Sequence, residues 1–233
     1  TGLTKITDHW SKSIVDLAID SARQAISESN TTPDMIIFAN TLSSYSSSQE
    51  NLSTIISEEL GLSDITAFKI ESSSCSGAMA VNIGHKLLNS DDLESVLIIG
   101  AEKMTDLSPA ETIKATALGE SYEYTQFFGI TMNSLYALFS RLYMEKYNVT
   151  SEELSQFSVL SHRHSVTCKH AQFNREFSLD SINKSATISS PLRMLNCSPI
   201  GDGSASLVLS KTNNSNFNDV NILSSTSSNS STS

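Results

Sequence analysis

Cys75 lies in a segment, residues 71–80, whose composition could support nucleophilic chemistry. It stands between an apolar run and a stretch of residues with helical spacing, so it is expected at the start of a helix. The partial positive charge of the free amides at a helix N-terminus stabilises the thiolate form of a cysteine. Gly77 and Ala78 are small, so a substrate could approach the sulfur closely. The other interpretation is a buried structural cysteine, because free cysteines are among the most buried residues. The residue types alone leave both open, although a strand-to-helix turn with small neighbours is typical of functional sites.

A nucleophilic thiol also needs a base, and the nearest histidine in sequence is His85, ten residues further along the same expected helix. At a rise of ~1.5 Å per residue, His85 would lie roughly 15 Å from Cys75, beyond hydrogen-bond reach. We therefore interpret His85 as a residue of the helix surface.

A second group of chemically active residues superficially resembles a metal site: His162, His164, Cys168 and His170. Only His164 and Cys168 are one helical turn apart, so a tetrahedral site would require the helix to break. An interaction surface or a loop is the better interpretation, and we predict no metal.

Two features near the end of the chain have structural interpretations. The segment 201–203, Gly-Asp-Gly, lacks the Lys and Ser/Thr pattern of a phosphate-binding loop, so it favours a tight turn. Cys197, just before it, is expected to be structural.

The first hundred residues alternate between helices and strands, and these elements would position Cys75. Apolar residues at helical spacing predict helices at 13–28, 52–60 and 78–88. Short apolar runs predict strands at 35–39, 65–70 and 96–99. Such alternation with short connections predicts an α/β fold with a mostly parallel sheet covered on both faces.

The pattern changes at about Pro109. A long helix is expected over 131–147, and a capping box of Thr150 and Glu153 predicts a further helix from Ser151 towards Cys168. Two helices with no strand between them indicate an insertion. The alternation resumes with a strand at 204–210, and the serine-rich tail 224–233 is predicted to be disordered.

Composition excludes several function classes. The 233 residues carry 15 Lys and Arg against 25 Asp and Glu, a net charge of −10, which argues against a nucleic-acid surface. No run approaches the ~18–20 apolar residues of a membrane span. Three cysteines are too few for a disulfide framework in a chain this long. They favour free thiols in a reducing compartment, so we expect a cytoplasmic protein.

Four ordered segments together carry a family resemblance. Residues 71–80 with 96–105 resemble the nucleophile helix and next strand of thiolases, in particular archaeal acetyl-CoA acetyltransferases and sterol-carrier-type thiolases. Residues 129–144 resemble the first helix of the thiolase loop domain, and 191–203 its return to the core sheet. Residues 162–173 resemble a further thiolase stretch, although Cys168-Lys169 replaces its usual Asn-Pro.

The resemblance implies site residues and an activity. Cys75 falls on the acyl-accepting cysteine, Ser198 on a serine that contacts the pantetheine of coenzyme A, and Met132 near the lining of the acyl pocket. The implied reaction is acetyl transfer to Cys75 followed by condensation of two acetyl-CoA molecules to acetoacetyl-CoA, or the reverse thiolysis. A coenzyme A thioester would be the substrate, with no separate cofactor.

The resemblance also implies an organisation. The expected fold is a layered αβα thiolase-like half with a mostly parallel mixed sheet and an inserted helical loop domain. Residues 1–108 would be the first part of the N-terminal core, 109–190 the loop domain covering coenzyme A, and 191–215 the return strand. Residues 216–233 would be the start of a C-terminal half and the tail. A homo-oligomer is implied, and hydroxymethylglutaryl-CoA synthase with a small bridging protein is the suggested partner.

The chain departs from thiolases in one respect: no His or Cys follows Ser210, whereas the second half of a thiolase supplies catalytic His and Cys residues. We therefore expect the N-terminal part of such an enzyme, as a truncated sequence or one subunit of a split enzyme, that is inactive in condensation alone. The alternatives are a non-catalytic scaffold that binds acyl-CoA or partners, and a ketoacyl-synthase relative.

Overall fold

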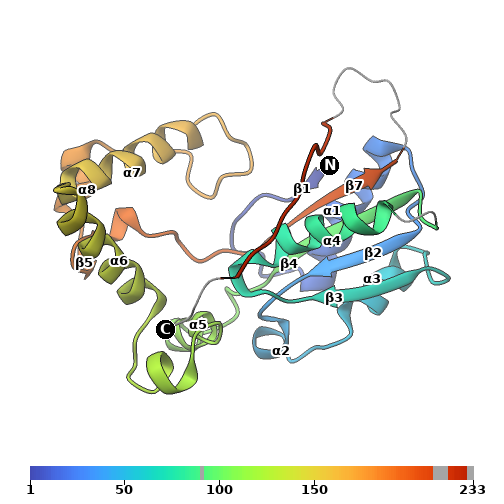
Figure 1. Ribbon diagram of the computed structural model, residues 1–233, viewed down its shortest axis with the longest axis horizontal. Helices are drawn as coiled ribbons and strands as arrows, with labels where there is room; N and C mark the ends of the chain where they lie inside the picture. Colours follow the sequence, from blue (N-terminus) through green and yellow to red (C-terminus); the bar gives the residue numbers. More distant parts are fainter. Residues whose placement is uncertain (90–91, 212–219, 230–233) are drawn as a thin grey trace. The chain divides into compact units, whose positions relative to one another are not determined.

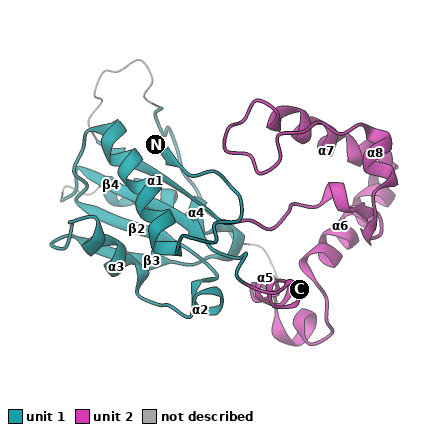
Figure 2. Ribbon diagram, turned by 180° about the vertical axis from the view of Figure 1, so that it is seen from behind, with its two compact units in different colours: residues 1–106, 202–233 teal, residues 107–201 magenta. Residues whose placement is uncertain are grey.

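The computed structural model describes residues 1–89, 92–211 and 220–229. They form two compact units, coloured separately in Figure 2. Unit 1 takes its residues from 1–106 and 202–233, and unit 2 is residues 107–201.

Unit 1 is built on a five-stranded sheet (Figure 1). Across the sheet the strands are β1 (Gly2–Leu3), β7 (Gly203–Ser210), β4 (Ser95–Glu102), β2 (Met35–Ala39) and β3 (Thr66–Ile70). β2 runs parallel to both β3 and β4, whereas β7 runs antiparallel to β4 and to β1. The predicted strands at 35–39, 65–70, 96–99 and 204–210 are therefore confirmed.

The sheet is mixed, as expected: β2, β3 and β4 are parallel, and β7 is the strand that pairs antiparallel with β4. Glu102 at the end of β4 lies opposite Gly203 at the start of β7. The chain thus leaves and rejoins the sheet at the same end, as in a hairpin whose connection has been lengthened by unit 2. Sequence alternation alone does not reveal that direction.

Helices cover both faces of the sheet. On one face α1 (Ile14–Ser29) and α3 (Leu52–Glu59) pack over β2 and β4, where Ile36, Phe38, Leu97 and Ile99 are completely buried. On the other face α4 (Ser76–Leu88) packs over a second set of core residues: Ile37, Ala39, Val96 and Ile98. Because successive residues of a strand point to opposite faces, the continuous apolar runs serve both layers.

The helix boundaries follow from local chemistry. At the start of α1, Ser13 Oγ accepts a hydrogen bond from Asp16 N at 3.1 Å and the Asp16 carboxylate accepts one from Ser13 N at 2.8 Å. This capping box satisfies amides that the first helical turn leaves free. The serine-rich loop after β2 contains a short helix that the sequence did not indicate, α2 (Ser43–Ser46).

Unit 2 is mainly helical. Its helices are α5 (Pro109–Ala117), α6 (Met132–Tyr147), α7 (Ser151–Ser165) and α8 (Leu179–Lys184), and its two short strands are β5 (Thr187–Ser189) and β6 (Leu192–Arg193). The predicted capping box before α7 is confirmed, with Glu153 N donating to Thr150 Oγ1 at 3.2 Å and Thr150 N donating to Glu153 at 2.8 Å. α7 ends at Ser165, one turn before Cys168.

Residues 220–229 form no helix or strand, and Ser225 Oγ accepts a hydrogen bond from Asn82 Nδ2 of α4 at 2.8 Å. The remaining parts of the predicted C-terminal segment and tail, 216–219 and 230–233, lie outside the described residues. Among the helices that the structure describes, none has the length and apolar character to cross a membrane.

Candidate functional site

The site lies where three parallel strands of unit 1 end. β3, β2 and β4 are adjacent and parallel, so their carboxyl ends share one edge of the sheet. The segments that follow them are 71–76, 40–43 and 103–106. In open α/β sheets this edge is the usual place for ligands.

Cys75 belongs to the segment after β3. It ends a short 3₁₀ helix, Ser73–Cys75, and is the N-cap residue of α4, as the sequence predicts. Its side chain is exposed, so the buried structural interpretation is wrong for this cysteine. A Cβ built onto Gly77 would meet nothing within 4 Å, which leaves the approach beside the thiol open. An exposed thiol at a helix N-terminus can act as a nucleophile.

The turn that carries Cys75 is held by hydroxyl groups. Ser76, a buried residue, donates from Oγ to Ser73 O at 2.7 Å and accepts from Ser72 N at 2.8 Å. Thr41, from the segment after β2, donates to the same Ser73 carbonyl at 3.1 Å. Ser73 itself has a positive φ of 48°, a region that non-glycine residues seldom adopt. These contacts tie the turn that carries Cys75 to the segment that follows β2.

Glu102 fastens the segment after β2 to the end of β4. Its carboxylate accepts hydrogen bonds from Thr41 N at 2.6 Å and from Asn40 Nδ2 at 2.9 Å. Burial raises the pKa of Glu102, although hydrogen bonds from Thr41, Leu42 and Asn40 act in the opposite direction. Sequence reasoning missed Glu102. A carboxylate as the last residue of a buried apolar strand could have indicated Glu102, because such a group needs hydrogen-bond donors from neighbouring segments.

A buried ion pair holds the same edge together on the β7 side. Asp202 is fully buried and accepts hydrogen bonds from Lys103 Nζ at 2.8 Å, Met104 N at 2.7 Å and Thr105 N at 2.9 Å. Burial would raise the pKa of Asp202, but hydrogen bonds from Lys103 and Thr105 hold it well below its usual range. For Lys103, burial lowers the pKa, and the contacts with Asp106 and Asp202 more than offset that effect.

The predicted tight turn at 201–203 is therefore wrong. Asp202 forms an isolated antiparallel bridge with Thr7, and β7 begins at Gly203. The Asp202 carboxylate accepts hydrogen bonds from backbone amides of the segment after β4. These contacts span about a hundred residues, so the local sequence of a turn does not predict them.

His85 and His162 both lie away from Cys75 in the sequence, and each belongs to a helix. His85 lies in the last turn of α4, at the opposite end from Cys75. In unit 2 the ring of His162 packs edge-on against Phe177, with centroids 4.7 Å apart. Among the described residues no group of three or more His, Cys, Asp or Glu side chains is placed to hold a metal ion.

The other two predicted site residues belong to unit 2. Met132 is the first residue of α6 and is partly exposed, and Ser198 is exposed in the loop between β6 and β7. Cys197, beside Ser198, is partly buried, and that burial raises the pKa of its thiol. Cys75 belongs to unit 1, so each unit contributes part of the predicted set.

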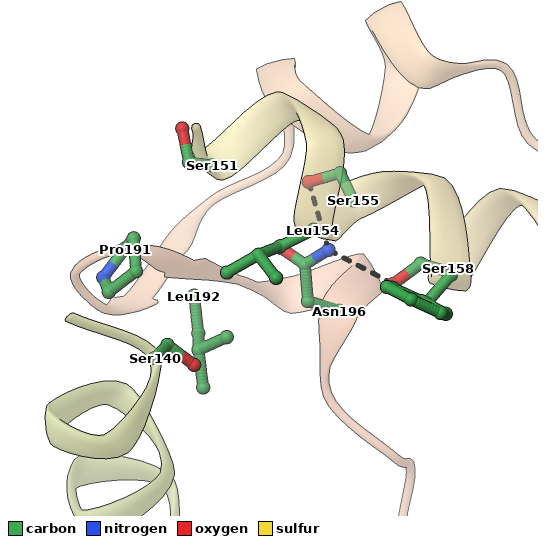
Figure 3. A pocket seen from close by; sticks show the side chains of 9 residues that line it. Ser140, Ser151, Leu154, Ser155, Ser158, Pro191, Leu192 and Asn196 are labelled. Carbon is green, nitrogen blue, oxygen red and sulfur yellow. Dashed lines mark hydrogen bonds between the residues drawn. The ribbon is translucent and has the colours of Figure 1, made fainter. Parts of the chain in front are cut away.

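Unit 2 contains a small pocket whose lining includes Asn196, two residues before Ser198. It has a volume of about 240 Å³ and is lined by residues of α6, α7 and β6 together with Pro191 and Asn196 (Figure 3). Asn196 Nδ2 donates to Ser155 Oγ at 3.2 Å and to Ser158 Oγ at 3.0 Å. These bonds fasten the segment leading to Ser198 onto α7.

Comparison with known proteins gives consistent results. The family model described as thiolase, N-terminal domain, matches residues 3–213. The acetyl-CoA acetyltransferase of Methanocaldococcus jannaschii is 31% identical over 211 residues, which cover 89% of this chain and 53% of that protein. The protein of the same name from Methanothermobacter thermautotrophicus is 31% identical, over 88% of this chain and 54% of the relative. The chain thus spans about half the length of these curated relatives.

Solved structures share the fold. The structure titled Ltp2-ChsH2(DUF35) aldolase superposes with a TM-score of 0.74 at 21% identity, covering 89% of this chain and 53% of that one. Human mitochondrial 3-ketoacyl-CoA thiolase in complex with CoA gives 0.68 at 15% identity, over 90% and 62% of the two chains. At these identities the likeness concerns the fold alone, and it is the expected layered α/β fold.

Proposed function

The chain belongs to the thiolase family, and we propose that Cys75 accepts an acyl group from a coenzyme A thioester. The observation that carries this proposal is the exposed thiol at the N-terminus of α4, on the carboxyl edge of the sheet. The thiolase N-terminal model spans that position. Thiolate chemistry in such a setting suits acyl transfer, because a covalent intermediate divides one difficult step into two easier ones.

In the proposed first step, the Cys75 thiolate attacks the thioester carbonyl of an acyl-CoA. A bond forms between Sγ and the acyl carbon, and the bond from that carbon to the coenzyme A sulfur breaks. Coenzyme A leaves as a thiolate and takes up a proton from solvent or a nearby acid. Backbone amides at the start of α4 would stabilise the negative charge that develops on the carbonyl oxygen.

In the proposed second step a base removes an α-proton from a second acyl-CoA, and the resulting carbanion attacks the acyl carbon held on Cys75. The bond from that carbon to Cys75 Sγ breaks, which releases the thiolate and gives a 3-ketoacyl-CoA; thiolysis is the same step in reverse. Positioned proton transfer to such a base contributes roughly 10²–10⁴-fold. We propose that this base lies outside residues 1–233. His85 stands at the far end of α4 from Cys75, and the relatives are about twice as long as the matched segment.

Unit 2 would bind the coenzyme A portion. In this proposal it is the loop domain, Ser198 contacts the pantetheine arm and Met132 lines the acyl pocket. The support for Ser198 is its exposure in a loop that Asn196 fastens to α7. We also propose a homo-oligomer and a second-protein partner. The proposal of a partner is supported by the structure titled Ltp2-ChsH2(DUF35) aldolase, which shares the fold of this chain.

The deciding experiment is mass spectrometry of the intact protein after incubation with acetyl-CoA. The expected result is one acetyl adduct, mapped to the peptide that contains Cys75 and absent from Cys75→Ser. Cys168→Ser is the matched control, because Cys168 is also an exposed thiol, and it should retain the adduct. An unmodified Cys75 in a protein that still binds acyl-CoA would instead support the non-catalytic scaffold.

A further inference from the structure

We propose that Thr41 is a positioning residue that fixes the place of the Cys75 thiol. This inference rests on the proposed role of Cys75 in acyl transfer. Thr41 does not belong to the nucleophile segment: it follows β2, whereas Cys75 follows β3. The two meet because β2 and β3 are parallel neighbours that end at the same edge, Ala39 opposite Ile70.

The hydroxyl of Thr41 reaches the backbone of the nucleophile turn. Oγ1 donates to Ser73 O at 3.1 Å and lies 3.2 Å from Ser76 Oγ. Ser76 Oγ donates to the same carbonyl at 2.7 Å. Two hydroxyls, one from a neighbouring strand end and one from the first residue of α4, therefore converge on one peptide group two residues before Cys75.

That peptide group needs to be held. Ser73 has φ of 48°, and a non-glycine residue in this region persists only where surrounding contacts fix it. Its conformation sets the direction in which the chain leaves β3 and enters α4. The position of the Cys75 sulfur relative to the sheet edge therefore depends on the hydrogen bonds to Ser73 O.

Thr41 is itself anchored on its backbone side. Its amide donates to Glu102 Oε1 at 2.6 Å, and Asn40 Nδ2 donates to the other Glu102 oxygen at 2.9 Å. Asn40 is 1% exposed and also donates to Ala101 O at 2.9 Å. Thr41 thus connects the ends of all three parallel strands. It follows β2, its amide donates to Glu102 of β4, and its hydroxyl donates to the turn after β3.

The structure offers matched substitutions for a test. Thr41→Val keeps the branched shape and the Glu102 contact but loses the hydroxyl, whereas Thr41→Ser keeps the hydroxyl. Thr66→Val, at the exposed first residue of β3, is the control for a threonine-to-valine change elsewhere in unit 1. Single-turnover acetylation of Cys75 in the intact protein is measured over a range of acetyl-CoA concentrations.

In Thr41→Val the maximal acetylation rate should fall about 10–100-fold, because displacing a reacting atom by ~1 Å can cost two orders of magnitude. The acetyl-CoA concentration for half-maximal rate should stay unchanged. Thr41→Ser and Thr66→Val should behave like the unmodified protein. A merely structural role would instead lower the unfolding midpoint and leave the rate of the folded fraction unaltered.

An unchanged maximal rate in Thr41→Val, or an equal loss in Thr41→Ser, would overturn the proposal. If Thr41→Val does not fold, Thr41→Ala removes the same hydroxyl without the branched side chain. If the unmodified protein is not acetylated at all, the acyl-transfer proposal fails on its own. Iodoacetamide labelling of Cys75, resolved by peptide, then still tests Thr41: labelling equally fast in Thr41→Val and Thr41→Ser overturns the positioning role.

Discussion

In unit 1 most of the large apolar side chains lie inside, with Trp10 an exposed exception, whereas unit 2 leaves most of its large apolar side chains exposed. Phe38, Leu97 and Ile99 of unit 1 are completely buried between the sheet and its helices. In unit 2 the buried apolar side chains include three alanines and Ile182, while Tyr124 is 76% exposed and Phe127 70% exposed. A sheet with helices on both faces builds its own core, whereas a few helices with outward-facing aromatic residues do not.

The two units differ in electrostatics as well. The Lys103–Asp202 pair of unit 1 joins side chains that are 4% and 0% exposed, whereas the Lys184–Asp180 pair of unit 2 lies in water. We infer that unit 1 has a core of its own, which positions Cys75 without help from unit 2. Unit 2, by contrast, presents large apolar side chains such as Tyr124 and Phe127 at its surface, a feature typical of interaction sites.

The largest test of this contrast is removal of the buried carboxylate. Asp202→Ala leaves Lys103 without its buried partner and the amides of His9, Met104 and Thr105 without an acceptor. It should therefore lower the free energy of unfolding of unit 1 by ~3–5 kcal/mol. Asp180→Ala breaks the exposed pair of unit 2 and should cost less than ~0.5 kcal/mol. Hydrogen exchange measured over a range of denaturant concentrations resolves the unfolding of both units.

Acid should destabilise unit 1 through the same carboxylate, because protonation of Asp202 weakens its contacts with Lys103 and the backbone amides. Because the pKa of Asp202 lies below its ordinary value in the folded state, its stabilising effect is present above ~3.9 and is lost as the pH falls below that value. Asp202→Asn should therefore lose less stability on acidification than the unmodified protein. Glu102, whose pKa is raised, has the opposite sign: its contribution decreases as the pH rises. Equal acid sensitivity of Asp202→Asn and the parent would contradict the assignment.

A paired truncation of leucines sharpens the comparison of the two cores. Leu97→Ala, at a completely buried position of β4, should lower the free energy of unfolding by ~2–5 kcal/mol, because it removes apolar contacts and leaves a cavity. Leu142→Ala, on the exposed face of α6, should change it by less than ~0.5 kcal/mol. A large loss from Leu142→Ala in the isolated chain would show that this face is already covered, which would remove the contrast.

The smallest test compares the two capping boxes. Ser13→Ala at α1 and Thr150→Ala at α7 should each cost ~1 kcal/mol, because each removes a side-chain acceptor for a free helix amide. If the units are independent, hydrogen exchange should increase only in unit 1 for the first variant and only in unit 2 for the second. Increased exchange in both units from either variant would mean that they unfold together.

The sequence predicted those features that depend on residues close together in the chain. The capping residues Thr150 and Glu153, and the apolar run that became β2, were predicted because capping and burial leave short-range signals. The direction of β7 and the role of Asp202 were not, since both depend on pairing across about a hundred residues. Thr41 and Glu102 belong to no motif, and only strand adjacency brings Glu102 to Thr41 and Thr41 to the turn that carries Cys75. The roles of Ser198 and Met132 and the predicted domain boundaries stay predictions.

The point of insertion has a consequence for how the chain could be rebuilt. Residues 103–202 leave and rejoin the sheet where Glu102 and Gly203 are register partners, so the ladder of β4 and β7 already holds both ends of the segment together. The entropy of closing a loop grows only slowly with its length, at about 0.6 kcal/mol per doubling. We therefore expect the β4–β7 ladder to accept a shorter or longer segment in place of unit 2 without a change in strand pairing.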